Sequence, residues 1–360
     1  MKQMRAFRLL ILLITLLCAL PLTAQRRIYH LPDLDGRVTL KCDFHLHTVF
    51  SDGDVWPRVR VDEAWRDGLD AIAITDHIEY LPHKGYIPVD HNAAWKLAEE
   101  SAREKNILYI RGAEITRKMP PGHLNALFIS DAAALDQADF LAVIEAAVKQ
   151  DAFILYNHPG WKSQQPDGVP RLYDIHHQLI EKGWLHGIEF YNYDEFYPLV
   201  LEFCKQYKLA VMGNSDMHGY ISEEYFKAPG DHRPMTLVFA KERTLESLRE
   251  ALFKGETLVW YGENLAGREE LAQAFFRKSV TLARPHHQDS KNLYLEMTNH
   301  SDIPCKLVHG LKGAPAALTL PAHAIVRVAI AKSFTGPLEY DVENILTGEK
   351  TVLHVAIPYP

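Results

Sequence analysis

The chain has 360 residues, of which 47% are hydrophobic and 24% are charged, and its formal net charge is −7. This ordinary globular composition excludes an intrinsically disordered protein, and the length allows one large α/β domain and a smaller second domain. The acidic balance argues against a general nucleic-acid-binding protein, which needs a basic surface.

The first 24 residues predict an export signal. A basic stretch precedes an uninterrupted apolar stretch, and small residues around Ala24 suit cleavage. The apolar stretch is short for a membrane span of about 20 residues, so cleavage is favoured over an uncleaved anchor. We therefore expect a periplasmic or secreted protein without a stable membrane anchor. The cysteines that remain after cleavage, Cys42, Cys204 and Cys305, do not form a disulfide framework.

Between residue 37 and about residue 262, apolar runs typical of buried strands alternate with amphipathic helical patterns. Alternation of this kind predicts a parallel sheet that is covered by helices on both faces. Because about seven such units follow one another, closure into a barrel is favoured over an open sheet. The expected strands are 38–47, 69–77, 107–114, 123–129, 152–160, 186–192, 209–218, 235–240 and 257–262, and the expected helices are 61–68, 93–106, 138–150, 172–183, 197–208 and 244–255.

The pattern changes after a last long helix, which is expected over about 264–283. The segments 292–310, 316–331 and 338–357 alternate short apolar runs with Asn, Asp, Gly and Pro turn signals. They predict a small all-β module of the sandwich type. The predicted organisation is an export signal over 1–24, a barrel domain over 25–275 and a β-sandwich-like domain over 276–360.

Side chains that can bind metals follow the ends of the predicted barrel strands. The stretch "KCDFHLHTVFSDGD", for example, ends a strand in two histidines and continues into an acidic loop. The carboxyl ends of parallel barrel strands open on one face, and residues i and i+2 of a strand point to the same side. We therefore expect the donors to converge. They are His45, His47, Asp52, His77, Glu114, His123, which begins a strand, His158, Asp216 and His218.

These donors exceed what one ion needs and suit two or three divalent ions. Glu114 is the natural bridge, because a carboxylate has two oxygens whereas an imidazole lends one nitrogen to a metal. Each residue alone also has a structural interpretation: a strand-end histidine is commonly a hydrogen-bonded structural residue, Asp52 suits a turn, and His123 suits a strand start. Packing does not explain why separate strands all end in metal-type donors. Asp43 is interpreted as a residue that orients a ligand or caps the strand end, rather than as a ligand itself.

The motifs "HLHT…SDG", "TDH", "GAE", "NHP" and "SDMH", in this order, resemble those of the PHP (polymerase and histidinol phosphatase) domain family over about residues 37–262. The resemblance implies a distorted (β/α)7 TIM-like barrel with two or three ions of zinc, manganese or iron. Some members of the family carry histidine where this chain has Asp52, which leaves the coordination of a third ion open. Export and a C-terminal β module are similar to a phosphodiesterase branch of the family. Carried over residue by residue, the resemblance assigns as ligands His45, His47, Asp52, His77, Glu114, His123, His158, Asp216 and His218.

The resemblance also implies phosphoester hydrolysis. Water that is shared by metal ions becomes hydroxide near neutral pH, and the ions neutralise the charge of a phosphoryl group. We therefore expect an exported enzyme that hydrolyses phosphodiesters or small phosphate esters by attack of a metal-bridging hydroxide. The candidate catalytic residues are Glu114, Asp216 and His218. Arg117 and His83 follow strand ends and are the candidates for binding phosphate oxygens.

Two alternatives are open at this point. An amidohydrolase-type enzyme would cleave C–N bonds on the same metal centre, but such barrels usually carry a bridging lysine or a lone late aspartate, whereas Asp216 is paired with His218. A non-catalytic protein would use the metals for stability and the β module to bind cell-surface material, and the full donor set counts against it. No nucleic-acid partner is expected, and the sequence leaves the oligomeric state open.

Overall fold

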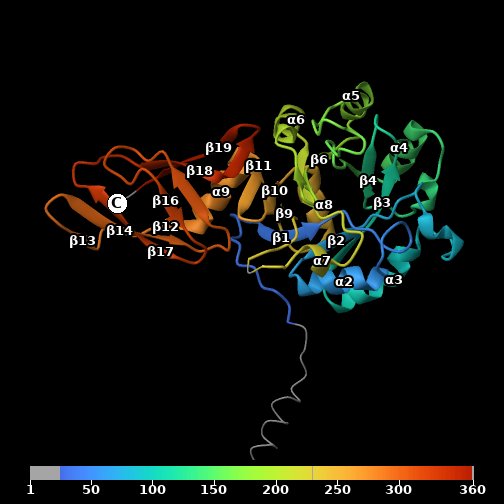
Figure 1. Cartoon of the computed structure of the whole chain (residues 1–360), viewed down its shortest axis with the longest axis horizontal. Coiled ribbons are helices and arrows are strands. Elements are labelled where there is room, and N and C mark those ends of the chain that lie inside the picture. The colour runs from blue at the N-terminus through green and yellow to red at the C-terminus, as the bar shows by residue number, and fades with distance from the viewer. Residues whose placement is uncertain (1–24, 229, 359–360) are drawn as a thin grey trace, which may run out of the picture.

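The computed structural model describes residues 25–228 and 230–358, so the predicted export signal over 1–24 lies outside the described residues. Figure 1 shows two parts side by side, a barrel with surrounding helices and a C-terminal β module. Within the described ranges, no helix is both long enough and apolar enough to cross a membrane.

Seven strands form the expected α/β barrel. Six neighbouring pairs are hydrogen-bonded in the order β1-β2-β3-β4-β5-β6-β8. A bridge between Leu46 and Met217, just beyond the ends of β1 and β8, closes the ring. The barrel strands are β1 (Val38–Asp43), β2 (Ala71–Ile74), β3 (Leu108–Thr116), β4 (His123–Leu127), β5 (Phe153–Tyr156), β6 (Gly187–Asn192) and β8 (Ala210–Asn214).

The strand directions differ from the prediction of an all-parallel sheet. β4 runs antiparallel to both β3 and β5, whereas the other neighbouring barrel pairs are parallel. The physical reason is the short connection over 117–122, because a parallel crossover needs a dozen or more residues. As a result β4 begins, rather than ends, at the face where the parallel strands end.

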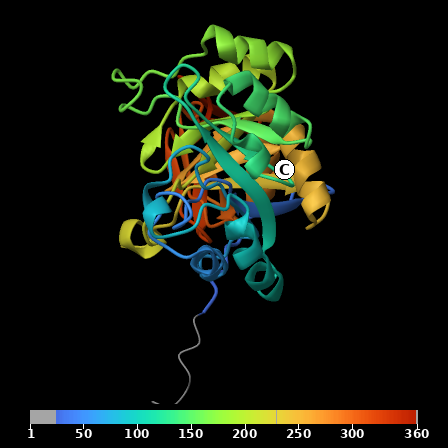
Figure 2. The same cartoon turned by 90° about the vertical axis from the view of Figure 1, so that its right-hand side faces the viewer.

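Helices surround the barrel, and Figure 2 shows α2 and α3 below the strands and the green α4–α6 above them. Two of them begin at side-chain caps, since Asp139 accepts a hydrogen bond from Ala142 N and Thr244 accepts one from Ser247 N. The helices of the barrel part are α2 (Pro57–Arg66), α3 (Ala93–Glu104), α4 (Phe140–Val148), α5 (Asp174–Glu181), α6 (Leu199–Tyr207), α7 (Ile221–Glu224) and α8 (Leu245–Phe253), with 3-10 turns at Pro82–Gly85 and Ala133–Leu135.

The barrel interior is a packed core rather than a channel. Inward-facing side chains such as Leu40, Cys42, Phe153 and Met212 form one apolar cluster, and Leu248 of α8 joins it. The three cysteines in the described ranges are buried and none forms a disulfide, as predicted. The core fills the barrel below the strand ends, which leaves the opposite end for polar side chains.

The sheet continues beyond β1 through antiparallel strands. β9 (Met235–Ala240) pairs with β1, β10 (Thr257–Tyr261) pairs with β9, and β11 (Asn264–Gly267) pairs with β10. The prediction of parallel strands was therefore wrong for 235–240 and 257–262. The helix expected over 264–283 is confined to α9 (Glu269–Ser279), because residues 264–267 turn back as β11.

The C-terminal part is all-β, as predicted. One sheet contains β12, β13, β14 and β17, and the other contains β15, β16, β18 and β19. The second sheet continues the barrel sheet, because β11 and β18 pair in parallel through Leu265 and Ile345. The predicted boundary between 275 and 276 lies inside α9. The remaining strands are β7 (Glu195–Phe196), β12 (Val280–Leu282), β13 (His287–Gln288), β14 (Asn292–Asn299), β15 (Cys305–Val308), β16 (Leu318–Leu320), β17 (Ile325–Ala331), β18 (Leu338–Gly348) and β19 (Thr351–Ile357).

Candidate metal centre

All nine predicted ligands meet at the end of the barrel where the parallel strands end. Each has a nitrogen–oxygen contact of 3.6 Å or less with another member of the set. The reversed direction of β4 explains why His123, the first residue of its strand, joins residues that follow theirs. The converging residues are His45, His47, Asp52, His77, Glu114, His123, His158, Asp216 and His218.

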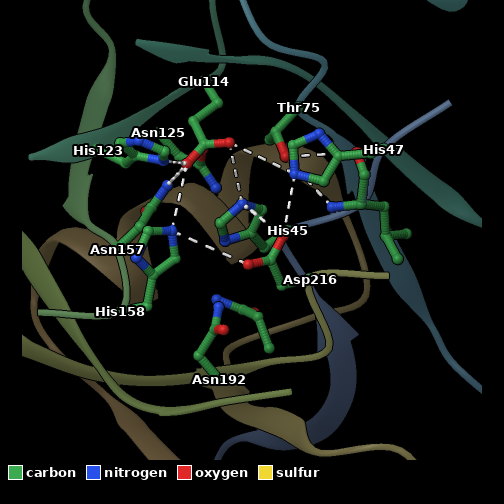
Figure 3. A network of polar contacts seen from close by, with 12 residues as sticks. His45, His47, Thr75, Glu114, His123, Asn125, Asn157, His158, Asn192 and Asp216 are labelled. Carbon is green, nitrogen blue, oxygen red and sulfur yellow. Dashed lines mark hydrogen bonds and ion pairs between the residues drawn. The ribbon is translucent and has the colours of Figure 1, made fainter. Parts of the chain in front are cut away.

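Four buried atoms form the inner part of this group: His45 Nε2, His47 Nε2, Glu114 Oε2 and Asp216 Oδ1. The four nitrogen–oxygen distances between them are 3.0–3.4 Å, and Figure 3 shows both rings joined to both carboxylates. None of the four atoms has a hydrogen-bond partner among residues 25–228 and 230–358. Ligand atoms of a tetrahedral ion bound at 2.0–2.2 Å lie about 3.4 Å apart. The four nitrogen–oxygen distances are therefore those of metal ligands, and His45, His47 and Glu114 form a group that could hold one divalent ion.

Glu189, on β6, orients this set from below. Its Oε1 accepts hydrogen bonds from His45 Nδ1 at 2.9 Å and from Asn214 Nδ2 at 2.9 Å. Its Oε2 accepts from His158 N at 2.7 Å and from Asn192 Nδ2 at 2.8 Å. Because Nδ1 of His45 donates its proton to Glu189, Nε2 is the atom that keeps a lone pair for a metal.

The carboxylates of the inner set are held in the charged form. Burial raises the pKa of Glu114, but His77, His45 and His123 outweigh burial and bring this pKa well below its usual range. Burial also acts on Asp216, yet His45 and His47 keep its pKa far below normal. Burial, together with His218 and His77, lowers the pKa of His47 to about 3. The carboxylates are thus ionised and His47 is neutral, as metal binding requires of them, whereas the nearby carboxylates outweigh burial and raise the pKa of His45 and raise that of His77 to about 10.

A second group lies beside the inner set and contains Asp52, His77 and His218. Asp52 Oδ2 is 3.4 Å from His77 Nε2 and 3.2 Å from His218 Nε2. Asp76, which is half-buried, holds the loop that carries Asp52, because it accepts hydrogen bonds from Thr48 N, Thr48 Oγ1 and Ser51 Oγ. These contacts make Asp52 part of an ordered site rather than a free turn residue.

The other oxygen of Glu114 faces a third group. Oε1 lies 3.0 Å from His123 Nδ1 and 3.6 Å from His158 Nε2, and it accepts a hydrogen bond from Asn157 Nδ2 at 2.9 Å. Figure 3 shows Glu114 between this group and the inner set. The two oxygens of Glu114 therefore contact different groups of predicted ligands, which is the geometry that a bridging carboxylate needs.

Arg60 of α2 connects the two chain segments that carry the predicted ligands His45, His47, Asp216 and His218. Its five N–H groups donate, each at 2.8 Å, to the carbonyls of His47, Met217, His218 and Gly219 and to the carboxylate of Glu63. The side chain is fully buried. Since β1 precedes His47 and β8 precedes His218, this one guanidinium fixes the two strand ends relative to each other.

Two of the converging residues adopt a backbone conformation that side chains rarely take. His158 has a φ of +25° and Asp216 a φ of +50°. Such residues cost about 1–3 kcal/mol each and persist where the surroundings hold them. Here the backbone N–H of His158 donates to Glu189, and that of Asp216 donates to the His45 carbonyl.

A cavity of about 580 Å³ opens above the three groups. Glu114, His158, Asp216 and His218 belong to its floor, and Trp161, Tyr80, Tyr193 and Tyr220 belong to its wall. A volume of this size holds a small organic ligand. The converging donors can therefore contact a ligand that enters the barrel end.

The two residues that were predicted to bind substrate do not line this cavity. The guanidinium of Arg117 pairs with Glu79 and donates to the Gln137 carbonyl at 2.8 Å. His83 lies in the 3-10 turn after β2, and its Nε2 is buried without a hydrogen-bond partner. Their role in substrate binding stays a prediction.

Asp43 has the orienting position that was predicted for it. It is buried and accepts hydrogen bonds from Ser215 N, Ser215 Oγ and Arg233 Nη1. It thereby fixes the residue next to Asp216. The functional residues that sequence reasoning missed are Glu189, Arg60, Asp76 and Asn157. Glu189 had a visible signal, since it is the one charged residue in the apolar run "GIEFY".

Comparison with known proteins agrees with this geometry. Residues 43–228 match the PHP domain family. A two-domain protein from Bacteroides vulgatus ATCC 8482 that contains a predicted PHP-like metal-dependent phosphoesterase is 42% identical, and its crystal structure superposes with a TM-score of 0.89 over 92% of this chain and 98% of that chain. An uncharacterized protein of Methanocaldococcus jannaschii is 24% identical over 208 residues, which cover 53% of this chain and 88% of that protein. The match to the Bacteroides structure extends over the barrel and the β module.

Proposed function

The chain belongs to the PHP domain family, and from this premise we propose that it is a metal-dependent phosphoesterase that hydrolyses phosphodiesters or small phosphate esters. One observation carries the proposal. Four buried donor atoms, on His45, His47, Glu114 and Asp216, lie below a cavity with nitrogen–oxygen distances of 3.0–3.4 Å and have no hydrogen-bond partner among the described residues. Such a set is costly unless it is neutralised, and a divalent ion neutralises it.

The proposal includes two or three divalent ions, of zinc, manganese or iron. The ligand atoms of His45, His47 and Glu114 would hold one, those of His47, Asp52, His77 and His218 a second, and those of His77, Glu114 and His123 a third. When bound, such ions lower the pKa of water and neutralise phosphoryl oxygens. Counting the ions by mass spectrometry, in the wild type and in Asp52→Ala, tests the second group separately from the inner set.

The catalytic residues in this proposal are Glu114, Asp216 and His218. The two oxygens of Glu114 contact two groups of predicted ligands, and Asp216 Oδ1 lies close to His45 and His47. His218 Nδ1 donates to the Asp216 carbonyl at 2.8 Å, so its Nε2, at the cavity, is the atom that can accept a proton or a metal. Together these residues orient the phosphoryl group and hold the charges that stabilise it.

Hydrolysis assays of the purified protein test the proposal. After loading with manganese or zinc, we expect turnover of bis-p-nitrophenyl phosphate or of the monoester, and chelation should abolish it. His47→Ala and Asp216→Ala should remove turnover while the fold is retained, and His354→Ala, on the exposed side of β19, serves as the matched control. Wild-type rates after exhaustive chelation would contradict the proposal.

An amide panel in the same assay addresses the alternative of C–N hydrolysis on the same centre. Turnover of amides without turnover of phosphate esters would favour the amidohydrolase-type activity. A protein that binds metal and hydrolyses neither class would favour the non-catalytic alternative. The cavity above the donors supports a catalytic protein, because ions that serve stability alone are usually enclosed by protein ligands.

We further propose that the protein is exported and acts in the periplasm or outside the cell. The proposal rests on the basic and apolar pattern of residues 1–24. Amino-terminal sequencing of the protein recovered from fractionated cells tests it, and a mature chain that starts close to residue 25 is the expected result.

A further inference from the structure

The outer wall of the cavity is acidic. Asp194, Glu195, Glu223 and Glu224 line it, and no lysine or arginine does so within residues 25–228 and 230–358. An enzyme for purely anionic phosphate esters would gain from cations at this place, since they bind phosphate oxygens. The wall is negatively charged instead of positively charged, although the floor below it fits a phosphoryl group.

The charge of this wall is largely uncompensated. The carboxylates of Asp194 and Glu223 have no hydrogen bond or ion pair with any residue that the structure describes. Glu195 accepts a hydrogen bond from the Tyr197 hydroxyl at 2.7 Å, which leaves its charge in place. Only Glu224 has a cation nearby, with Lys227 Nζ at 3.7 Å and both side chains exposed. The carboxylates are therefore available to a ligand.

Aromatic side chains stand among these carboxylates. Tyr193 and Tyr220 line the same cavity and are exposed. The backbone of Tyr193 is fixed, because its carbonyl accepts from the Tyr225 hydroxyl at 2.8 Å and its N–H donates to the Asn214 carbonyl. Partial burial and a hydrogen bond to Glu224 raise the pKa of the Tyr193 hydroxyl, so this ring and a carboxylate share one part of the wall. Aromatic faces beside carboxylates bind organic ammonium groups.

The floor of the cavity supplies an independent sign of a ligand. Glu114 Oε2 and Asp216 Oδ1 are buried, belong to residues of the cavity lining and have no hydrogen-bond partner. They mark the end where the phosphoryl group binds if the proposed function holds. The acidic and aromatic wall marks the other end.

Building on the proposed function, we infer that the substrate is a small phosphodiester in which one alcohol carries an ammonium group. The phosphoryl group lies over the converging donors, and the ammonium group lies against Tyr193, Tyr220 and the carboxylates of Asp194 and Glu223. The cavity of about 580 Å³ accommodates a compact zwitterion of this kind. The same uncompensated wall disfavours polynucleotides, whose further phosphates would face it.

A pair of chromogenic esters tests the inference: p-nitrophenyl phosphorylcholine and its isostere without the ammonium charge, p-nitrophenyl 3,3-dimethylbutyl phosphate. The two differ only in nitrogen against carbon at the quaternary centre. We expect kcat/KM for the choline ester to exceed that for the isostere by at least about tenfold. The ratio should fall in Asp194→Asn and in Glu223→Gln, and it should stay at the wild-type value in Glu246→Gln, an exposed control on α8.

The outcomes separate the inference from the proposed function. Equal turnover of the two esters, or turnover of bis-p-nitrophenyl phosphate without turnover of the choline ester, overturns the inference and leaves the phosphoesterase standing. Failure of every phosphate ester overturns the phosphoesterase itself. The ethanolamine analogue, run beside the choline ester, distinguishes a primary from a quaternary ammonium group.

Two further experiments use only the wild-type protein. Tetramethylammonium should inhibit hydrolysis of bis-p-nitrophenyl phosphate competitively and more strongly than 3,3-dimethylbutan-1-ol does, and equal inhibition would contradict the inference. Glycerophosphocholine in solution and phosphatidylcholine vesicles distinguish a free ester from a lipid headgroup. The cavity predicts hydrolysis of the free ester, and hydrolysis of the vesicles alone would overturn the assignment of a small soluble substrate.

Discussion

Four hydrogen-bond donors converge on the carboxylate of Glu189, and this residue defines the lone pair that His45 offers to a metal. Glutamine has nearly the same shape, but it has only one oxygen and adds an N–H₂ group among four donors. The substitution therefore changes the hydrogen bonding while it preserves the packing.

Glu189→Gln should weaken metal binding by about 10–100-fold, because His45 loses the partner that sets its tautomer. Competition with a chelating dye measures the affinity. Glu100→Gln, on the exposed side of α3, is the matched control and should bind metal like the wild type. A variant at Glu189 with unchanged affinity would show that the orientation of His45 does not depend on this carboxylate.

His176 is a buried histidine outside the metal centre. Its Nδ1 accepts a hydrogen bond from Tyr173 N at 3.0 Å, its Nε2 bonds the Pro121 carbonyl at 2.7 Å, and its ring stacks on Tyr156. Since one nitrogen accepts and the other donates, only the neutral ring fits. Burial lowers the pKa of His176 to about 4.

This pKa makes stability depend on pH. The unfolded chain binds the proton of His176 below about pH 6.5 and the folded chain only below about pH 4, so the free energy of unfolding falls as the pH drops through this window. The loss amounts to about 3 kcal/mol. In urea unfolding between pH 7 and pH 4.5, the difference between wild type and His176→Gln should shrink with acidity. For Gln178→Ala, a neighbouring control that removes no titratable group, the difference should stay constant.

The nine donors could be predicted from the sequence because each is a chemically distinctive side chain next to an apolar run. The residues that position them could not. Arg60 is one charged residue in an amphipathic helix, and nothing in the spacing shows that it reaches four carbonyls across β1 and β8. Asn157 is an ordinary polar neighbour of His158 until the fold brings it to Glu114. Such contacts depend on distances between elements.

At the scale of elements, the strands and helices of the barrel were predictable from their alternation, whereas strand direction was not read correctly. β4 follows a connection of six residues, which is too short for a parallel crossover, and this length was visible in the sequence. The start of the last helix pattern was also ambiguous. Residues 264–267 are apolar enough for either state, and their pairing with β10 decides for a strand.

Arg60 joins α2 to the ends of β1 and β8, and its replacement tests how far the metal centre depends on this link. Lysine has three donors instead of a planar fork of five, so Arg60→Lys should leave buried carbonyls without partners. We expect the free energy of unfolding to fall by about 3 kcal/mol in urea titrations with chelator present. Arg103→Lys, on the exposed side of α3, should change it little. A wild-type value for Arg60→Lys would mean that water replaces the lost donors.

At the scale of the whole molecule, the barrel and the β module are joined by a continuous sheet and a continuous core. β11 pairs with β18, and Asn344 of β18 donates to the carbonyls of Glu263 and Pro304. One hydrophobic cluster includes Leu265 of the barrel sheet together with Leu295 of the module. The sequence predicted both parts but could not predict this pairing, because β11 and β18 are about 70 residues apart.

We therefore expect the two parts to unfold in one transition. All six tryptophans lie between Trp56 and Trp260, so their fluorescence reports on the barrel alone. Tyr294→Trp adds a reporter on β14 of the module. Heating should give the same midpoint for the wild type and for this variant, by fluorescence and by circular dichroism. Two separated midpoints would contradict the coupling.

The outer wall of the cavity is built from the turn at Asp194 and the short helix α7, which contains Glu223, while the donors below it are anchored by β strands and by Arg60. Replacing an exposed residue of this wall therefore leaves the converging donors in place. A few substitutions at the rim can change which ligand the cavity accepts, at little cost to folding. The amino-acid sequence would then change faster at the entrance of the cavity than at its floor.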